Sequence, residues 1–371
     1  MNVNSDSTDV RVPGVRGLHV PMHCTDLTAT MTFLIDRLGF RIDAIFPADQ
    51  PRTAMLSREG FAIRLSTQVR EGVTELDVLC DDPDSVAGGT RELIAPNGVR
   101  LRLVHANPPL RTPPTRQTLV LASASENANW SVGRAGMRYR DLLPERHGGA
   151  FIASHIRILE GGPVPDYVHY HKTRFQMIFC RKGWVRLVYE GQGEPFVLEA
   201  GDCVLQPPEI RHRVLESSAG AEVVEIGSPA DHITMADHTM ALPTQRYAPE
   251  HEFNGQRFVH HVKARAAWTP WTSAGFVAAD TGIGAATNGV AGVRVVRHSG
   301  EPCAAVRRHD TEFCFFFVLA GAVDVVQGER QWRLAADDSV TIPGQLPYSL
   351  ANGSDDLELL EVTLPAVFEL A

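Results

Sequence analysis

Cysteine is scarce in this chain, and its six cysteines show no paired spacing. They are spread from one end of the sequence to the other, as Cys24, Cys80, Cys180, Cys203, Cys303 and Cys314. No CxxC pair and no closely spaced set is present, which excludes a disulfide scaffold of the kind found in small secreted domains. We expect reduced and mostly buried thiols.

Long apolar runs and clusters of basic residues are also missing. No stretch approaches the roughly 18 apolar residues that a membrane-spanning helix requires, and Met1 to Gly17 lacks the apolar core of a signal peptide. The 371 residues carry a formal net charge of -9 without a run of Lys and Arg, which disfavours nucleic acid and anionic membranes as partners. We therefore expect a cytoplasmic protein that binds a small molecule.

The first predicted domain, residues 15–106, has a βαβββ pattern. A short strand at residues 17–20 precedes Asp26, a favourable helix N-cap, and apolar residues at helical spacing then continue to Gly39. Three short strands, at residues 40–46, 53–57 and 61–66, are separated by turn residues.

The segments GLHV, DLTATMTFLIDRLGFRI and IAPNGVRLRLV of this domain resemble the vicinal-oxygen-chelate superfamily, the glyoxalase and bleomycin-resistance fold. Residues 74–105 are too few for a complete second module of that fold. Arg64 and Arg102 stand where the resemblance implies metal carboxylates, and two cations would repel a divalent ion. His19 stands alone at a ligand position. We expect a metal-free domain that serves as a cap, a dimer surface or a ligand-binding remnant.

A boundary follows at residues 107–116, which hold four prolines and predict a stiff linker. We assign residues 107–146 to this linker and a lead-in. From residue 151 onward the chain is a series of short strands with turn signals, and a second series spans residues 293–364. Such a pattern is typical of antiparallel sandwiches or barrels. We expect one barrel in residues 147–240, and a connection plus a second barrel in residues 241–371.

The two predicted barrels contain the same motif. The first copy comprises His169, His171, Gln176, Gly183, Pro207 and His212. The second copy, at an offset of 138 and then 136, comprises Arg307, His309, Cys314, Gly321, Pro343 and Tyr348. Only the first copy retains three histidines, so we expect the chemistry there and a structural role for the second copy.

The three histidines predict a metal site. His169 and His171 are two residues apart, so on a strand their side chains leave the same face, and the turn after Pro207 directs His212 toward them. This pattern resembles the two motifs of the cupin superfamily, HxH(x)4E(x)6G and G(x)5PxG(x)2H, with Gln176 and Glu209 as departures. The resemblance implies a mostly β protein: two cupin-type antiparallel β-barrels, or a bicupin, after the small α+β domain.

Gln176 replaces the acidic ligand of the motif and changes the charge of the site. Imidazole and amide are neutral, so a divalent ion held by His169, His171 and His212 keeps its full charge and favours a dianionic chelating ligand. Gln176 either ligates the ion or hydrogen-bonds to a metal-bound water or substrate oxygen. We expect one divalent metal per chain, Fe(II) being preferred because imidazole suits it; Zn, Mn or Ni are alternatives.

Three-histidine cupin centres without the glutamate are most similar to the oxygen-using branch of the superfamily. This branch includes the gentisate and salicylate ring-cleaving enzymes, together with diketone- and thiol-dioxygenases. This resemblance implies a dioxygenase that acts on a small chelating substrate, such as an aromatic hydroxy acid or hydroxyketone, together with O2. Two alternatives remain: a non-redox isomerase or lyase, which would need a general base, and a small-molecule sensor. Arg157 is either a catalytic clamp on a substrate carboxylate or a solvated outer-face residue. We also expect a homodimer.

Overall fold

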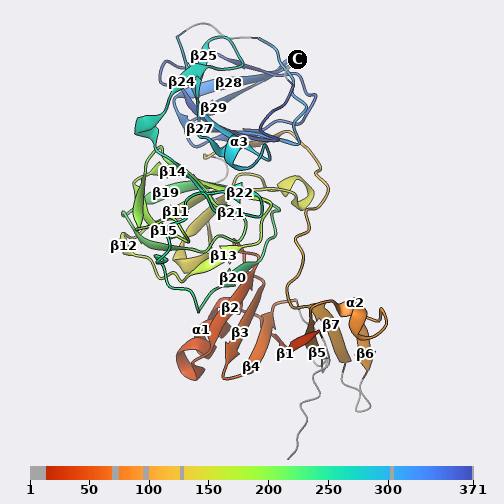
Figure 1. The fold of residues 1–371 in the computed structure, drawn as a ribbon. Coiled ribbons are helices and arrows are strands. Elements are labelled where there is room, and N and C mark those ends of the chain that lie inside the picture. Colours follow the sequence, from red (N-terminus) through yellow and green to blue (C-terminus); the bar gives the residue numbers. More distant parts are fainter. Residues whose placement is uncertain (1–13, 69–74, 95–99, 126–128, 301–304, 370–371) are drawn as a thin grey trace, which may run out of the picture. The chain divides into compact units, whose positions relative to one another are not determined.

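A computed structural model describes residues 14–68, 75–94, 100–125, 129–300 and 305–369. The chain divides into two compact units (Figure 1). Unit 1 comprises Met1–Pro47 and Pro51–Leu110, and unit 2 comprises Ala48–Gln50 and Arg111–Ala371. Among the described residues, no helix is long and apolar enough to cross a membrane.

Unit 1 begins with the predicted βαβββ order, which is confirmed. Its elements are β1 (Val15–His23), α1 (Leu27–Leu38), β2 (Arg41–Phe46), β3 (Thr53–Arg58) and β4 (Phe61–Ser66). Helix α1 starts where the Asp26 side chain accepts a hydrogen bond from the Ala29 amide at 2.9 Å, and ends at Gly39 with φ of 67°. The left-handed value explains the glycine, because it carries no Cβ penalty there.

The second half of unit 1 is a shortened copy of the first. It contains β5 (Glu75–Cys80), α2 (Pro83–Val86), β6 (Glu92–Ile94) and β7 (Arg100–His105). Strand β5 pairs in parallel with β7, just as β1 pairs in parallel with β4, and β1 and β5 pair with each other in antiparallel orientation. Among the described residues of this copy, one strand and most of the helix are missing, as the short segment predicted.

The first sandwich of unit 2 consists of two facing antiparallel sheets. One sheet has the order β16-β15-β18-β13-β20, with β12 beside β18, and the other has the order β23-β17-β14-β19-β11-β10-β9. The strands are β9 (Ser131–Val132), β10 (Arg138–Asp141), β11 (Ile152–Ile158), β12 (Gly162–Pro163), β13 (His169–His171), β14 (Phe175–Lys182), β15 (Trp184–Tyr189), β16 (Phe196–Glu199), β17 (Cys203–Leu205), β18 (His212–Ser217), β19 (Ala221–Ser228), β20 (Thr234–Ala236) and β23 (Val259–His261).

The second sandwich repeats this plan with sheets β24-β25-β26-β32-β27-β30-β8 and β29-β28-β31. Its elements are β8 (Val120–Ala122), β24 (Trp268–Pro270), β25 (Phe276–Asp280), α3 (Ile283–Ala286), β26 (Gly292–His298), β27 (Phe313–Ala320), β28 (Ala322–Gln327), β29 (Arg330–Ala335), β30 (Ser339–Thr341), β31 (Ser349–Ala351) and β32 (Glu358–Leu364). Neither sandwich closes into a hydrogen-bonded barrel within the residues that the structure describes.

The two seven-stranded sheets of unit 2 share one apolar core. Phe151 of the first sandwich stacks on Phe313 of the second, with ring centroids 4.4 Å apart, and Phe315 and Phe317 belong to the same cluster. Phe316 points the other way, into the interior of the second sandwich. This explains the continuous apolar run in β27, because both faces of the strand are buried.

The predicted linker and lead-in, residues 107–146, contain more structure than expected. Strand β8 pairs with β30 of the second sandwich, whereas β9 and β10 extend a sheet of the first. The signals for these strands were weak because each spans only two to four residues. The partner of β8, strand β30, is also distant in the chain.

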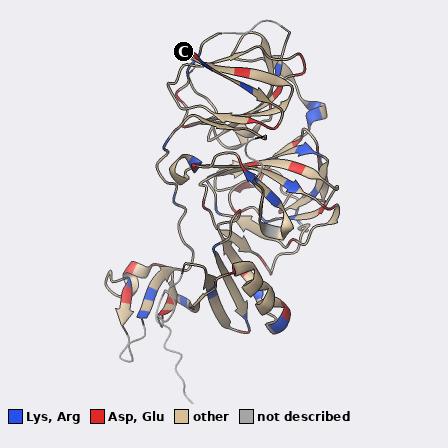
Figure 2. Ribbon diagram, turned by 180° about the vertical axis from the view of Figure 1, so that it is seen from behind, with Lys and Arg blue, Asp and Glu red and all other residues tan. Residues whose placement is uncertain are grey.

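Acidic and basic residues are interspersed along the strands of both units (Figure 2). Many of them pair with a neighbouring strand, as Arg297 of β26 does with Glu358 of β32 and Arg333 of β29 with Asp324 of β28. Such cross-strand pairs stabilise a sheet locally.

Candidate metal centre

The three predicted histidines converge inside the first sandwich. His169 and His171 lie on β13, and His212, the first residue of β18, lies directly opposite His169 in the antiparallel register. All three side chains are buried, and the nitrogen that each offers lies within 4.8 Å of the other two. The structure therefore brings together the residues that the spacing had selected.

Hydrogen bonds at Nδ1 prepare these imidazoles for a metal. Nδ1 of His169 donates to the Tyr167 carbonyl at 2.8 Å, and Nδ1 of His212 donates to the Ile210 carbonyl at 3.0 Å. A carbonyl only accepts, so the proton sits on Nδ1 and Nε2 is the nitrogen that carries the lone pair. Nδ1 of His171 bonds to the Thr234 hydroxyl at 2.9 Å. Three neutral imidazoles oriented in this way fit a divalent transition metal.

The turn before His212 keeps the backbone shape of the motif although its glycine is absent. Glu209 has φ of 65°, in the left-handed region, and its amide donates to the His171 carbonyl at 3.0 Å. This bond ties the loop of the third histidine to the strand of the first two. A non-glycine residue in this conformation costs roughly 1–2 kcal/mol, which the turn tolerates in order to hold His212.

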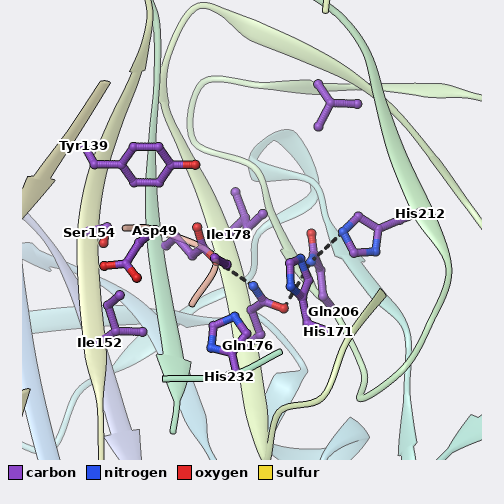
Figure 3. A pocket seen from close by; sticks show the side chains of 13 residues that line it. Asp49, Tyr139, Ile152, Ser154, His171, Gln176, Ile178, Gln206, His212 and His232 are labelled. Carbon is purple, nitrogen blue, oxygen red and sulfur yellow. Dashed lines mark hydrogen bonds between the residues drawn. The ribbon is translucent and has the colours of Figure 1, made fainter. Parts of the chain in front are cut away.

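Gln176 is part of the same cavity, and its orientation is fixed by a carboxylate. Its Nε2 donates to Glu225 of β19 at 2.5 Å (Figure 3). A carboxylate can only accept, so the amide oxygen of Gln176 must face the other way, toward Gln206 and the histidines. Gln206 Nε2 donates to that oxygen at 3.4 Å and lies 3.3 Å from His212 Nε2.

Tyr189 extends this network on the far side of Gln206. Its hydroxyl donates to Gln206 Oε1 at 2.8 Å, and its ring stacks on His212 with centroids 5.4 Å apart. Burial raises the pKa of Tyr189, so the phenol keeps its proton and acts as a donor. Because Gln206 accepts from Tyr189 at one end, its amide group must present N–H toward the histidines.

The cavity around these residues is small, with a volume of about 50 Å³. It is lined by Ala48, Asp49, Tyr139, Ile152, Ser154, His171, Gln176, Ile178, Gln206, His212, Val214, Glu225 and His232. The His232 ring stands edge-on to His171, with centroids 5.3 Å apart, and its Nδ1 donates to the Pro229 carbonyl. This bond leaves His232 Nε2 as an acceptor in the cavity wall.

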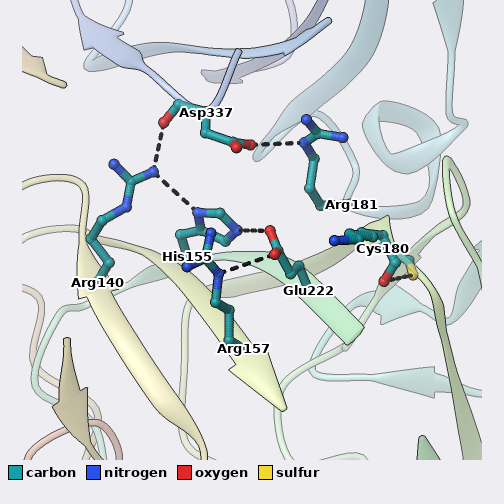
Figure 4. Close-up of polar contacts among 8 residues, drawn as sticks. Arg140, His155, Arg157, Cys180, Arg181, Glu222 and Asp337 are labelled. Atoms are coloured by element: carbon teal, nitrogen blue, oxygen red, sulfur yellow. Dashed lines mark hydrogen bonds and ion pairs between the residues drawn. The ribbon is translucent and has the colours of Figure 1, made fainter. Parts of the chain in front are cut away.

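Arg157, the predicted substrate clamp, is not brought to the histidines. Residues of β11 alternate, so Ile152 and Ser154 line the cavity whereas Arg157 lies on the opposite face. There its Nε donates to Glu222 at 3.0 Å (Figure 4). Its guanidinium also stacks on Trp130, at 4.2 Å from the ring centroid. This placement is the outer-face alternative and argues against a direct role on substrate.

A second cluster with ligand-type side chains, His155, Glu222 and Asp337, is held by cations instead. Arg140 bonds to His155 and to the Asp337 carbonyl, Arg157 bonds to Glu222, and Arg181 pairs with Asp337 at 3.0 Å (Figure 4). Three guanidinium groups would repel a divalent ion at this position. The cluster therefore acts as a polar connection between the two sandwiches.

In the second sandwich, Arg307 stands at the position that His169 occupies in the first, and aromatic rings surround its guanidinium group. The Arg307 guanidinium stacks on Trp271 at 4.1 Å and on Tyr348 at 4.9 Å, and its Nη1 donates to Ser273. His309 is buried beside it, and burial together with the Arg307 charge lowers the pKa of His309 to about 4. One neutral histidine next to a fixed cation is not a metal site.

In unit 1, the two arginines at the predicted ligand positions share one acid. Arg64 Nε donates to Asp77 at 2.5 Å and Arg102 Nε donates to the same carboxylate at 2.8 Å. His19 lies opposite Asp77 in the register of β1 and β5, and burial lowers its pKa. The Asp77 carboxylate is thus engaged by two cations, one of which, Arg102, also pairs with Glu75 at 3.3 Å.

Comparison with known proteins agrees with this architecture. Residues 155–227 and 294–363 match the family model of the cupin domain, one match in each sandwich, which confirms the predicted pair of cupin-type domains. No curated protein matches the chain.

Two solved structures of similar fold are a salicylate 1,2-dioxygenase of Pseudoaminobacter salicylatoxidans with gentisate and an oxalate decarboxylase of Lactobacillus farciminis in complex with formate. The first has 16% identity and a TM-score of 0.51, covering 70% of this chain and 86% of that chain. The second has 15% identity and a TM-score of 0.50, covering 70% and 90%. At such identities the likeness shows the fold alone.

Sequence reasoning did not select six polar residues that line the cavity: Asp49, Tyr139, Ser154, Gln206, Glu225 and His232. Glu225 had one usable signal, an acidic residue in an otherwise apolar strand, and Gln206 directly precedes the motif proline Pro207. Tyr139 and His232 come from segments outside both motifs. Only the folded chain brings them to the histidines.

Proposed function

We propose that this protein is a metal-dependent cupin enzyme, a dioxygenase with one Fe(II) ion held by His169, His171 and His212. The observation that carries the proposal is the oriented set of three buried imidazoles, two of which have a proton fixed on Nδ1 by a backbone carbonyl. When bound, Fe(II) would lower the pKa of a coordinated hydroxyl group and activate O2.

The cavity supports a small substrate. A cavity of roughly 150 Å³ holds one benzene molecule, whereas this one has a volume of about 50 Å³. We therefore favour an aliphatic hydroxyketone or hydroxy acid that chelates through two adjacent oxygens over an aromatic hydroxy acid. The neutral ligand set of three histidines and Gln176 favours a chelate that carries negative charge.

The side chains around the centre provide donors and acceptors for such a substrate. Gln206 directs its amide N–H toward His212 Nε2, so it is suited to donate to a substrate oxygen bound there. Gln176, oriented by Glu225, presents its carbonyl oxygen on the same side. We propose that Gln176 is either a weak fourth ligand or a hydrogen-bonding residue at the centre.

The similar structures support the proposal at the level of the fold. They include one enzyme that uses dioxygen and one decarboxylase, and the β-sandwich pair is common to both. Unit 1 resembles the vicinal-oxygen-chelate fold in its βαβββ order and its shortened repeat. We propose that it is a metal-free remnant of that fold.

One observation favours a second candidate, a non-redox isomerase or lyase. The ligand positions of the motif contain no carboxylate, but the cavity does, because Glu225 reaches it from β19. A carboxylate within hydrogen-bonding reach of a chelated substrate is the group that proton abstraction next to a carbonyl requires.

Oxygen uptake separates the two candidates. The protein is loaded with Fe(II) under anaerobic conditions and then exposed to O2. It should consume O2 only after a small hydroxyketone or hydroxy acid is added, and the His169→Ala variant should show no such uptake. The His309→Ala variant is the matched control and should retain uptake. Exchange of substrate hydrogen with D2O without oxygen uptake would instead favour the isomerase or lyase.

A further inference from the structure

The second sandwich contains a larger cavity than the metal centre. Its volume is about 250 Å³, against about 50 Å³ for the cavity around the histidines. It is lined by Thr269, Pro270, Trp271, Thr272, Ala278, Asp280, Arg294, Ala366, Val367 and Phe368. This volume exceeds the roughly 150 Å³ that holds a benzene molecule.

The strand registers show that this cavity is the counterpart of the metal pocket. Asp141 pairs with Ser154 in the first sandwich, and Asp280 pairs with Arg294 in the second. Ser154 therefore corresponds to Arg294, and both residues line their respective cavities.

The strands behind the two cavities also correspond, although Ile178 and Glu225 line the first cavity whereas Phe316 and Glu361 do not line the second. Ile178 pairs with Glu225 in the first sandwich, and Phe316 pairs with Glu361 in the second. Glu225 and Glu361 thus hold the same position. His232, edge-on to His171, has its counterpart in Phe368, which is edge-on to His309 at 6.4 Å.

The replacements change what this cavity can bind. Trp271 lines this cavity and stacks on Arg307, which stands at the position of the first metal ligand. No histidine is among the described residues that line the cavity. In place of a metal, the cavity offers the Arg294 guanidinium and the Asp280 carboxylate, which lie 3.7 Å apart. Trp271 and Phe368 add aromatic walls.

Two hydrogen bonds hold the Arg294 guanidinium in position and leave some of its N–H donors for a ligand. Its Nη1 donates to Glu361 at 3.3 Å and its Nη2 donates to the Ala366 carbonyl at 3.3 Å. A guanidinium has five N–H groups, so others remain for a ligand. The contact with Asp280 is long and that side chain is 60% exposed, and exposed ion pairs of this kind contribute little to stability. A ligand can therefore insert between the two groups at small cost.

We propose that this cavity binds a small carboxylic acid that carries a hydrogen-bond donor on the adjacent carbon, that is, an α-amino or α-hydroxy acid with an apolar side chain. The carboxylate meets Arg294, the amino or hydroxyl group donates to Asp280, and the apolar substituent packs between Trp271 and Phe368. No metal takes part, so the site is distinct from the histidine centre and does not depend on the function proposed for it.

Isothermal titration of the metal-loaded full chain tests this assignment with four probes of one shape: phenylalanine, phenyllactate, 3-phenylpropionate and phenethylamine. Phenylalanine or phenyllactate should bind at millimolar concentration or below. 3-Phenylpropionate, which lacks the hydrogen-bond donor, should bind more weakly. Phenethylamine, which lacks the carboxylate, should not bind. Arg294→Gln should weaken binding at least tenfold, because it removes the one cation among the described residues that line the cavity.

The chain offers a matched control on the same strand. Arg297 of β26 pairs with Glu358 of β32, as Arg294 pairs with Glu361, but Arg297 does not line this cavity. Arg297→Gln should therefore retain binding. Asp280→Asn changes an exposed side chain. It should weaken the binding of phenylalanine more than the binding of 3-phenylpropionate.

Three results would overturn the assignment. The first is the absence of heat and of a thermal shift with every probe. The second is equal binding by the wild type and Arg294→Gln. The third is loss of binding in His169→Ala, which would place the ligand at the histidine centre.

Discussion

Gln176 Nε2 donates to Glu225 at 2.5 Å across neighbouring strands β14 and β19. The motif position that carries a glutamate in the cupin pattern is an amide here, and a carboxylate from the next strand holds that amide. The negative charge is thus displaced from the ligand position to a residue behind it. Because a carboxylate only accepts, this contact also fixes which end of Gln176 faces the histidines.

The first prediction concerns this pair. Gln176→Glu places two carboxylates at hydrogen-bonding distance and should destabilise the metal-free protein by roughly 1–3 kcal/mol, because one acceptor loses its donor and like charges meet. The double variant Gln176→Glu/Glu225→Gln exchanges donor and acceptor and should recover most of the loss. Urea unfolding of the four proteins measures the coupling; additive losses would contradict it.

The second prediction tests the position of Arg157. Since its guanidinium contacts Glu222 and Trp130 rather than the cavity, Arg157→Gln should lower stability by about 1 kcal/mol. It should leave KM for the substrate within about twofold of the wild type. Steady-state kinetics beside thermal unfolding provide the check. A rise in KM of tenfold or more with unchanged stability would restore the clamp hypothesis.

The third prediction concerns the turn before His212. Glu209 adopts φ of 65° where the motif has glycine, so Glu209→Gly should stabilise the protein by roughly 0.5–1 kcal/mol. Glu209→Val should destabilise it, because a β-branched residue is strained in this conformation. Gln345 has φ of 66° at the equivalent turn of the second sandwich, and Gln345→Gly serves as a comparison. Loss of stability in Glu209→Gly would contradict this account of the turn.

The fourth prediction is a pH dependence from His309. Its pKa in the folded chain is lowered to about 4, against about 6.5 in an unfolded chain. The unfolded state therefore binds the proton more readily than the folded state. The contribution of neutral His309 to the free energy of unfolding is complete above pH 6.5 and is lost as the pH falls from 6.5 to about 4. The loss is at most on the order of 3 kcal/mol.

Replacing His309 should flatten this part of the stability profile. Thermal unfolding of the wild type and of His309→Gln should be followed between pH 7 and pH 4. The difference in stability between the two proteins should narrow as the pH falls, because only the wild type loses the contribution of His309. Parallel curves over this range would exclude the assignment to His309.

The sequence predicted the histidines and most strands because these signals are local. His169 and His171 share a face through the two-residue strand period, and the spacing from Pro207 to His212 is that of one turn. Asp26 and Gly39 marked both ends of α1 in the same way. Each of these features depends on residues within one element or one turn.

The remaining parts of the cavity depend on contacts between distant segments. Glu225 reaches the site because β19 pairs with β14, and Tyr139 reaches it because β10 pairs with β11. Strand β8 joins the second sandwich before the chain enters the first. The face of Arg157 stayed open in the sequence because alternation shows which residues share a face but not which face is the interior.

Metal stoichiometry tests the central claim most directly. Purified wild-type protein and the His309→Ala variant should each carry about one divalent ion per chain by mass spectrometry, and the His169→Ala and His212→Ala variants should lose most of it. Two ions per chain, or an undiminished metal content in His169→Ala, would contradict a single centre built from the three histidines of the first sandwich.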